Sequence, residues 1–182
     1  MDFLELLKEK YGSNTNRITH SIGVKNFAVS LAKKLGVDSK KCEIAALFHD
    51  YYRYDSNEDL IKMMDPKDYQ IYKDMPWSYH GLAAGNMIKE FGITDIDIIN
   101  SIKYHTVGRK NMSIYEKIIY VADFSEINRT HEGSKEVRDM ALVDFNKAFL
   151  MSIEYTYKHT NDLNVLELLK YFVQFVLSSY TT

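Results

Sequence analysis

The sequence contains very little cysteine and proline. Cys42 is the single cysteine among 182 residues, so neither an internal disulfide nor a thiolate-rich metal site can form. The two prolines, Pro66 and Pro76, fall in one stretch between longer periodic segments, which leaves most of the chain without the residue that breaks helices most strongly. The shortage of cysteine fits a reducing compartment, and we expect a cytoplasmic protein.

Long apolar runs and an excess of one charge are also missing. No run approaches the ~20 residues of a membrane span, and the segment MDFLELLKEKYG carries acids where a signal peptide carries bases. The formal net charge is -2, and the basic runs at 39–41 and 109–110 are short. These features predict no membrane partner and no nucleic-acid partner.

Alternating, strand-like segments are absent as well, which predicts an all-α protein. The 46% hydrophobic composition is sufficient for one domain over residues 1–182, with a motif-bearing core at 15–141 and C-terminal helices in 142–182 packing on it. Caps and apolar periodicity predict a bundle of about 7–9 helices. The helical segments are expected at about 2–10, 15–35, 40–53, 57–64, 67–74, 78–91, 95–105, 113–129, 134–158 and 162–180.

Side chains that can bind a metal recur within the apolar stripes of these segments. The candidates are His20, His49, Asp50, His80, His105 and Asp123. A lone histidine on an apolar face is more often a hydrogen-bonded core residue, and a buried carboxylate is often paired with a cation. However, an unpaired buried carboxylate costs several kcal/mol, and convergence on metal would satisfy all six groups together.

The chemistry of these six groups narrows the choice of metal and leaves an alternative open. Nitrogen and oxygen ligands without sulfur suit iron, manganese, cobalt, nickel or zinc. Six ligands exceed the needs of one ion, whereas a bridging carboxylate would let them serve a dinuclear site of the kind that hydrolyses phosphate esters and anhydrides. The alternative is a purely structural helical protein whose histidines are satisfied by hydrogen bonds.

With these residues identified, the chain resembles the HD-domain metal-dependent phosphohydrolases. The signature is a first histidine, the His49–Asp50 doublet and a distant aspartate, Asp123. More closely, the chain is similar to the YqeK-type family, the symmetrical diadenosine tetraphosphate hydrolases of bacteria. The segments that carry this resemblance lie within residues 17–141 and are RITHSIGV, AALFHDYYR, HGLAAG, IKYHTVGRKNMSIYEKIIYVADFSEINR and EVRDMA.

The resemblance implies an HD-domain helical bundle with the metal site in its core. In that family pattern one ion is held by His20, His49, Asp50 and Asp123. Asp50 would bridge to a second ion held by His80 and His105. Iron is the ion usually associated with the family. The implied reaction is hydrolysis of a dinucleoside tetraphosphate into two nucleoside diphosphates by metal-activated hydroxide, so that diadenosine tetraphosphate gives two ADP.

Further residues are candidates for catalysis and substrate binding. His49, Asp50 and Glu126 are the catalytic candidates, and Glu126, one turn after Asp123, would orient a ligand histidine or water. Cations and small polar groups near the ligands are candidates for binding phosphate: Arg17, Arg53, Thr106, Gly108, Arg109 and Arg129. Arg17 and Arg53 are expected on the helix faces of His20 and His49. Four tyrosines could stack on adenine, although packing is their commoner role: Tyr51, Tyr52, Tyr54 and Tyr79.

Other functions are compatible with the same residues. An HD-type nucleotidase or nucleoside phosphatase would use this metal centre on another nucleotide, and a non-catalytic nucleotide or metal sensor would retain the fold. The C-terminal apolar stripe could either cap the site or form a homodimer interface. Its residues include Leu163, Val165, Leu166, Leu169, Phe172 and Phe175.

Overall fold

The computed structural model describes residues 2–179, and the side chains of 2–174. Within these residues the chain forms eleven α-helices, two short 3-10 helices and no strand, so the all-α prediction is confirmed and the expected count of about 7–9 is too low. The α-helices are α1 (Phe3–Tyr11), α2 (Thr15–Lys34), α3 (Ser39–Phe48), α4 (Asn57–Met63), α5 (Pro66–Tyr72), α6 (Tyr79–Met87), α7 (Ile96–Lys103), α8 (Ile114–Ser125), α9 (Ser134–Ala141), α10 (Phe145–Thr160) and α11 (Leu163–Ser179). The 3-10 helices are η1 (Pro76–Ser78) and η2 (Ile88–Phe91).

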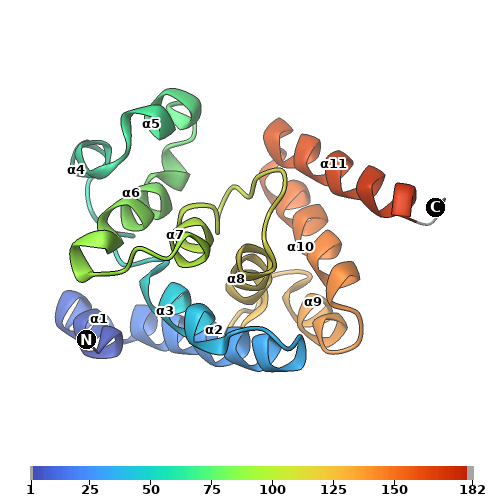
Figure 1. Ribbon diagram of the computed structural model, residues 1–182, viewed down its shortest axis with the longest axis horizontal. Coiled ribbons are helices and arrows are strands. Elements are labelled where there is room, and N and C mark those ends of the chain that lie inside the picture. Colours follow the sequence, from blue (N-terminus) through green and yellow to red (C-terminus); the bar gives the residue numbers. More distant parts are fainter. Residues whose placement is uncertain (1, 180–182) are drawn as a thin grey trace.

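Helices α2, α3, α7 and α8 form the centre of the bundle. Each of α3, α7 and α8 packs against the other two, and α2 packs against α3 and α8. In Figure 1, α8 is seen nearly end-on in the middle, α4 to α6 lie to one side and α9 to α11 to the other. Fully buried side chains such as Leu31, Phe48, Ile102 and Ile119 fill the space between the central helices. The site described below lies among these central helices and α6.

Side-chain caps begin most of the helices that carry site residues. The carboxamide oxygen of Asn14 accepts from the Arg17 backbone N–H at the start of α2. Ser113 and Glu116 form a capping box at the start of α8. Ser78 does not cap α6 with its side chain, because its Oγ donates to the Met75 carbonyl.

Several predicted helices end earlier than periodicity indicates. The segment expected at 40–53 ends at Phe48, and residues 49–54 form turns. The segment expected at 113–129 ends at Ser125, and that expected at 95–105 ends at Lys103. Apolar spacing continues past these ends because turn residues also face the core, so the pattern alone overestimates helix length.

The segment expected as one helix at 134–158 is two helices. Residues 142–144 interrupt it, and Asp144 begins α10 by accepting a hydrogen bond from the Lys147 backbone N–H. An aspartate at this position competes for backbone N–H groups and so favours a new helix start. The predicted helix end at 180 lies outside the described backbone, and the side chain of Phe175 lies outside the described side chains.

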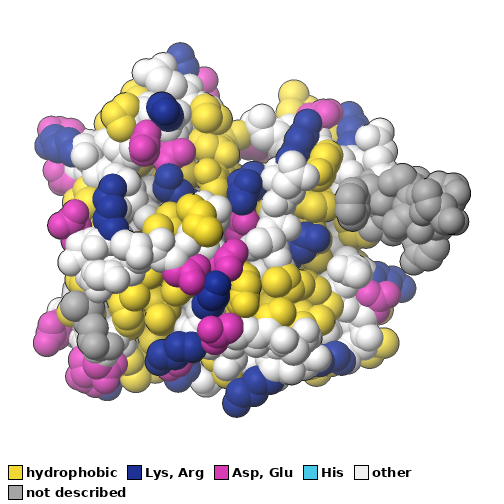
Figure 2. Space-filling view, viewed as in Figure 1, with side chains coloured by type: hydrophobic (Ala, Val, Ile, Leu, Met, Phe, Trp, Pro, Cys, Tyr) yellow, Lys and Arg dark blue, Asp and Glu magenta, His cyan; other side chains and the backbone are white. Residues whose placement is uncertain are grey.

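The C-terminal helices pack on the motif-bearing helices. α10 contacts α8 and α9, and α11 contacts α10. Val165, Leu168 and Phe172 of α11 are buried, whereas Leu163 is 71% exposed. No helix among the described residues is both long enough and apolar enough to cross a membrane. On the face shown in Figure 2, basic and acidic side chains are interspersed, with apolar patches between them.

Candidate metal centre

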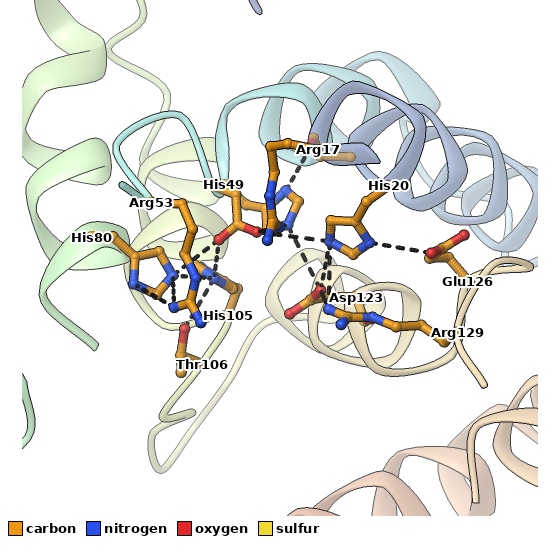
Figure 3. A network of polar contacts seen from close by, with 12 residues as sticks. Arg17, His20, His49, Arg53, His80, His105, Thr106, Asp123, Glu126 and Arg129 are labelled. Atoms are coloured by element: carbon orange, nitrogen blue, oxygen red, sulfur yellow. Dashed lines mark hydrogen bonds and ion pairs between the residues drawn. The ribbon is translucent and has the colours of Figure 1, made fainter. Parts of the chain in front are cut away.

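Five separate segments bring the six predicted ligands together. His20 lies on α2, His80 on α6 and Asp123 on α8, while His49 and Asp50 follow the end of α3 and His105 follows the end of α7. Figure 3 shows the four histidines and Asp123 pointing toward one another. The side chain of His49 is fully buried, and those of His20 and Asp123, at 11% and 19% exposed, are the most exposed of the six. The six predicted ligands therefore form one cluster, although three of them lie in turns rather than on helices.

Asp50 is the centre of this cluster. Its Oδ2 lies 3.4 Å from His49 Nε2 and 3.7 Å from His20 Nε2. Its Oδ1 lies 3.0 Å from His80 Nε2 and 3.6 Å from His105 Nε2. One carboxylate thus faces two pairs of histidines, each through a different oxygen, and the ligand atoms of each side lie within 4.8 Å of one another.

Asp123 adds a second carboxylate to one side only. Its Oδ1 is 3.1 Å from His20 Nε2 and 3.7 Å from His49 Nε2. Ile119, one turn before Asp123, is buried, whereas Ile127, four residues after it, lies beyond the end of α8 and is 70% exposed. Asp123 is held in place instead by its contacts within the cluster.

The imidazole rings are oriented by hydrogen bonds from Nδ1. The Nδ1 atoms of His49 and His105 donate to the backbone carbonyls of Ala46, at 2.6 Å, and Ile102, at 2.7 Å. A carbonyl can only accept, so each ring carries its proton on Nδ1 and directs the Nε2 lone pair into the cluster. His49 Nε2 is buried and has no hydrogen-bond partner. An aligned, unpartnered lone pair among carboxylates fits a metal ligand.

Glu126 orients a third ring, that of His20. Its Oε1 lies 3.2 Å from His20 Nδ1, and its Oε2 accepts from the backbone N–H and the side-chain amide of Asn128. Glu126 is 1% exposed, and α2 approaches it closely because Gly23 has no side chain. These contacts support the predicted role of Glu126 in orienting a ligand histidine.

Burial and neighbouring charges shift the pKa values of the cluster in opposite directions. Burial alone would lower the pKa of His49, but Asp50 and Asp123 outweigh it and raise this pKa to about 10. Burial also lowers the pKa of His80, in this case to about 4. The pKa of Asp50 stays well below its usual range, because the surrounding histidines outweigh the effect of its burial. At pH 7 the carboxylate is therefore ionised and His80 is neutral, which are the forms that bind metal, whereas an ion that binds His49 would displace the proton that the two carboxylates favour there.

Three arginines contact the cluster. Arg17 forms an ion pair with Asp50 Oδ2, and Arg129 Nη2 donates to Asp123 Oδ1 at 2.6 Å. Arg53 Nη1 lies 3.1 Å from His80 Nδ1. The predicted position of Arg53 on the helix face of His49 is wrong, because the turn after Phe48 redirects its side chain toward His80.

Of the remaining predicted substrate-binding residues, one lies within the cluster and two lie apart from it. Thr106 Oγ1 lies 2.9 Å from His105 Nε2, within the cluster. Gly108 instead lies against Leu168 of α11 with a φ of +63°. Arg109 forms a two-pronged ion pair with the buried Glu116, at 2.7 and 2.8 Å. The structure therefore places Gly108 and Arg109 in a packing contact and a helix cap, apart from the ligands.

Some residues that support the centre were not expected from the sequence. The Tyr11 hydroxyl donates to the Asp50 carbonyl at 2.5 Å and lies 3.0 Å from that of Tyr51. Arg138 donates to the carbonyls of Ser125 and Glu126 at the end of α8. Tyr11 carries no local motif, and only the tertiary fold brings it to Asp50, whereas Arg138 lies in the segment EVRDMA, which carries part of the family resemblance.

The comparisons with known proteins agree with this geometry. Residues 17–126 match the family model for the HD domain. The symmetrical bis(5'-nucleosyl)-tetraphosphatase of Bacillus subtilis strain 168 is 40% identical over 78% of this chain and 77% of its own length. The protein of the same name from Halalkalibacterium halodurans is 41% identical, over 76% of this chain and 75% of its own length.

A solved structure extends the likeness to nearly the whole chain. A "predicted HD superfamily hydrolase involved in NAD metabolism" from Clostridium acetobutylicum matches with a TM-score of 0.82 and 34% identity, covering 94% of this chain and 95% of that one. The matched regions contain all six cluster residues. The chain therefore belongs to the HD-domain family, in the group of the symmetrical bis(5'-nucleosyl)-tetraphosphatases.

Proposed function

We propose that this protein hydrolyses dinucleoside tetraphosphates symmetrically, converting diadenosine tetraphosphate and water into two ADP. The observation that carries the proposal is the carboxylate of Asp50, whose two oxygens face two separate histidine pairs. The activity named for the relatives at about 40% identity supports the choice of substrate. Arginines at the edge of the cluster supply the positive charge that a polyphosphate requires.

The proposal includes two divalent ions. His20, His49, Asp50 and Asp123 would hold one, and Asp50, His80 and His105 the other. Iron is the proposed metal, and manganese, cobalt, nickel and zinc have the same ligand preferences. Bound ions of this kind lower the pKa of a coordinated water and neutralise phosphoryl oxygens. The buried free thiol of Cys42 is consistent with the cytoplasmic location that we propose.

The chain's own residues have distinct tasks in this scheme. Arg17 and Arg129 bind carboxylate oxygens of the cluster and would turn to phosphate oxygens when substrate enters, because the guanidinium fork matches both anions. Glu126 keeps His20 in the orientation that directs Nε2 inward. The Thr106 hydroxyl, beside His105, can donate to a phosphate oxygen.

The test is the set of products formed from diadenosine tetraphosphate, separated by anion exchange after incubation with iron or manganese. We expect ADP alone, and no turnover by the His49→Ala variant, which controls for contaminating enzymes. AMP together with ATP would contradict the symmetrical cut. An intact substrate with every metal, but turnover of another nucleotide, would favour the HD-type nucleotidase instead.

A further inference from the structure

Two cavities adjoin the metal-ligand cluster on different sides. The first, of about 210 Å³, is bordered by His105, Thr106 and Asp123 of the cluster region and extends toward α10. The second, of about 390 Å³, is bordered by Arg17 and His20 and extends toward Tyr54. We call them the α10 pocket and the Tyr54 pocket. Each opens from a different histidine of the cluster, and each is a concave surface with apolar and polar walls, as in small-molecule sites.

The α10 pocket has an aromatic wall. The ring of Phe124 lies 4.6 Å from that of His131 and is nearly parallel to that of His159, at 6.4 Å and 14°. The opposite positions carry hydroxyl groups, including those of Thr106 and Thr156. The cluster does not use His131 or His159, although both can stack on a flat ring.

The Tyr54 pocket repeats this combination with different residues. Of the four tyrosines near the ligands, Tyr51, Tyr52 and Tyr79 pack into or against the core, whereas Tyr54 is 61% exposed. The Arg17 guanidinium lies 5.5 Å from the centre of its ring. Polar side chains from α2 and the loop after α8 complete the wall, among them Thr19 and Asn128.

Arg129 borders both pockets and separates them. Its Nε donates to the Asp123 carbonyl at 2.9 Å, and its Nη2 donates to the Asp123 carboxylate (Figure 3). The loop that carries it is fixed by Ser134, whose hydroxyl contacts the carbonyls of Arg129 and His131. Gly133 in the same loop lies against the ring of Tyr155, with no room for a Cβ. In this structure Arg129 and the loop that carries it therefore form the partition between the two pockets.

We propose that the two pockets hold the two nucleoside ends of one dinucleotide, with the polyphosphate crossing the metal-ligand cluster between them. This inference rests on the proposed function and explains its symmetry. If only one nucleoside were bound, the bond cleaved would be set by counting phosphates from one end. With both ends bound, the middle of the polyphosphate is placed over Asp50, which lies between the two sides.

The test measures the affinity of a dinucleotide that resists the proposed cut, diadenosine tetraphosphate with a methylene group in place of the central bridging oxygen. Tyr54→Ala and His159→Ala each remove one aromatic wall, and the double variant removes both. We expect each single change to weaken binding about tenfold, as for loss of one base–aromatic stack, and the double change about a hundredfold. ADP, which has one nucleoside, should lose only about tenfold in the double variant.

Two control variants leave both pockets intact. Trp77→Ala removes an aromatic ring of η1 that is 45% exposed, and Lys158→Ala changes the neighbour of His159 in a surface ion pair with Glu154. Both should bind the analogue like the parent, and all variants should show the helical circular dichroism of the parent. The proposal is overturned if either pocket variant binds the analogue within twofold of the parent, or if ADP loses as much affinity as the analogue in the double variant.

The outcomes distinguish this inference from the proposed function, because the readout is binding of an uncleaved ligand. Two independent losses of affinity with AMP and ATP as the products of the parent enzyme would support the two pockets and contradict the symmetrical cut. If ADP were the sole product but one pocket variant bound the analogue as tightly as the parent, the symmetrical cut would be supported and the two-pocket inference contradicted.

Discussion

The two sides of Asp50 differ in charge, although each offers two histidines. The His20–His49 side has Asp123 as a second carboxylate and Glu126 behind His20. On the His80–His105 side, Asp50 is the only carboxylate of the described residues within 4.0 Å of a histidine nitrogen, the Thr106 hydroxyl lies 2.9 Å from His105 Nε2, and Arg53 lies against His80. Arg17 and Arg129 offset part of the negative charge on the first side, but Asp123 and Glu126 still leave it the more negative of the two. A divalent ion is stabilised by nearby negative charge, so the first side should bind metal more tightly. The comparison implies one tightly held ion and one that exchanges more readily.

The largest effect is expected from removing the residue that both sides share. Asp50→Ala should abolish hydrolysis, by roughly a thousandfold or more, because neither ion would keep its carboxylate between the histidines. The purified variant should lose both ions, which elemental mass spectrometry would show as a lower number of metal ions per chain. Asp139→Ala, which changes a surface ion pair with Lys135, is the matched control. Full metal content in Asp50→Ala would contradict the shared role.

Removing one histidine from each side should distinguish the tightly held ion from the exchangeable one. We expect His20→Ala to lose the tightly held ion, and His80→Ala to keep it while losing the exchangeable one, because only the first side has its own carboxylate in Asp123. The measurement is metal content before and after dialysis against a weak chelator. Equal losses in the two variants would show that the difference in charge has no consequence for binding.

A smaller effect is expected from the group that orients His20. Glu126→Gln keeps the size of the side chain but removes its charge, so His20 becomes a weaker ligand. Loss of such an outer contact typically costs about 10–100-fold in metal affinity. The loss should appear only for the tighter ion in a metal titration. Glu154→Gln on the exposed face of α10 is the control. An equal loss of metal affinity in this control would contradict a specific role of Glu126 in orienting His20.

The smallest effects are expected from adding a Cβ at a glycine that packs against a ligand histidine or against the residue that orients it. A Cβ at Gly23 would lie 2.1 Å from Glu126 Oε2, and one at Gly81 would lie 2.8 Å from His105 Cε1. Each alanine substitution should reduce the free energy of unfolding by about 1–3 kcal/mol, the usual cost of overpacking. Gly23→Ala should weaken the tighter ion and Gly81→Ala the other. Thermal unfolding and metal titration together check this, and a reversed assignment would contradict the geometry.

The sequence revealed the ligands better than their surroundings, for a physical reason. A histidine or aspartate within an apolar stripe is costly unless it is satisfied, so His20, His80 and Asp123 stand out wherever the helix ends. Helix ends are set by backbone hydrogen bonds and turns, which periodicity does not report. For that reason the direction of Arg53 was predicted incorrectly.

Contacts between distant segments were the least predictable. Arg109 pairs with Glu116 rather than being free to bind phosphate, and no feature of the sequence indicates which of these two partners it contacts. The Tyr11 hydroxyl reaches the carbonyl of Asp50, which is 39 residues further along the chain. Both depend on how whole helices pack, which no local pattern encodes.

The most direct test of this account is to remove bound metal from the parent protein with a chelator and then to titrate metal back while measuring the heat of binding by calorimetry. We predict two ions per chain, bound in two distinguishable steps, with the tighter step lost in His20→Ala and the weaker step lost in His80→Ala. Binding of a single ion per chain, or of none, would contradict a centre in which Asp50 serves both pairs of histidines.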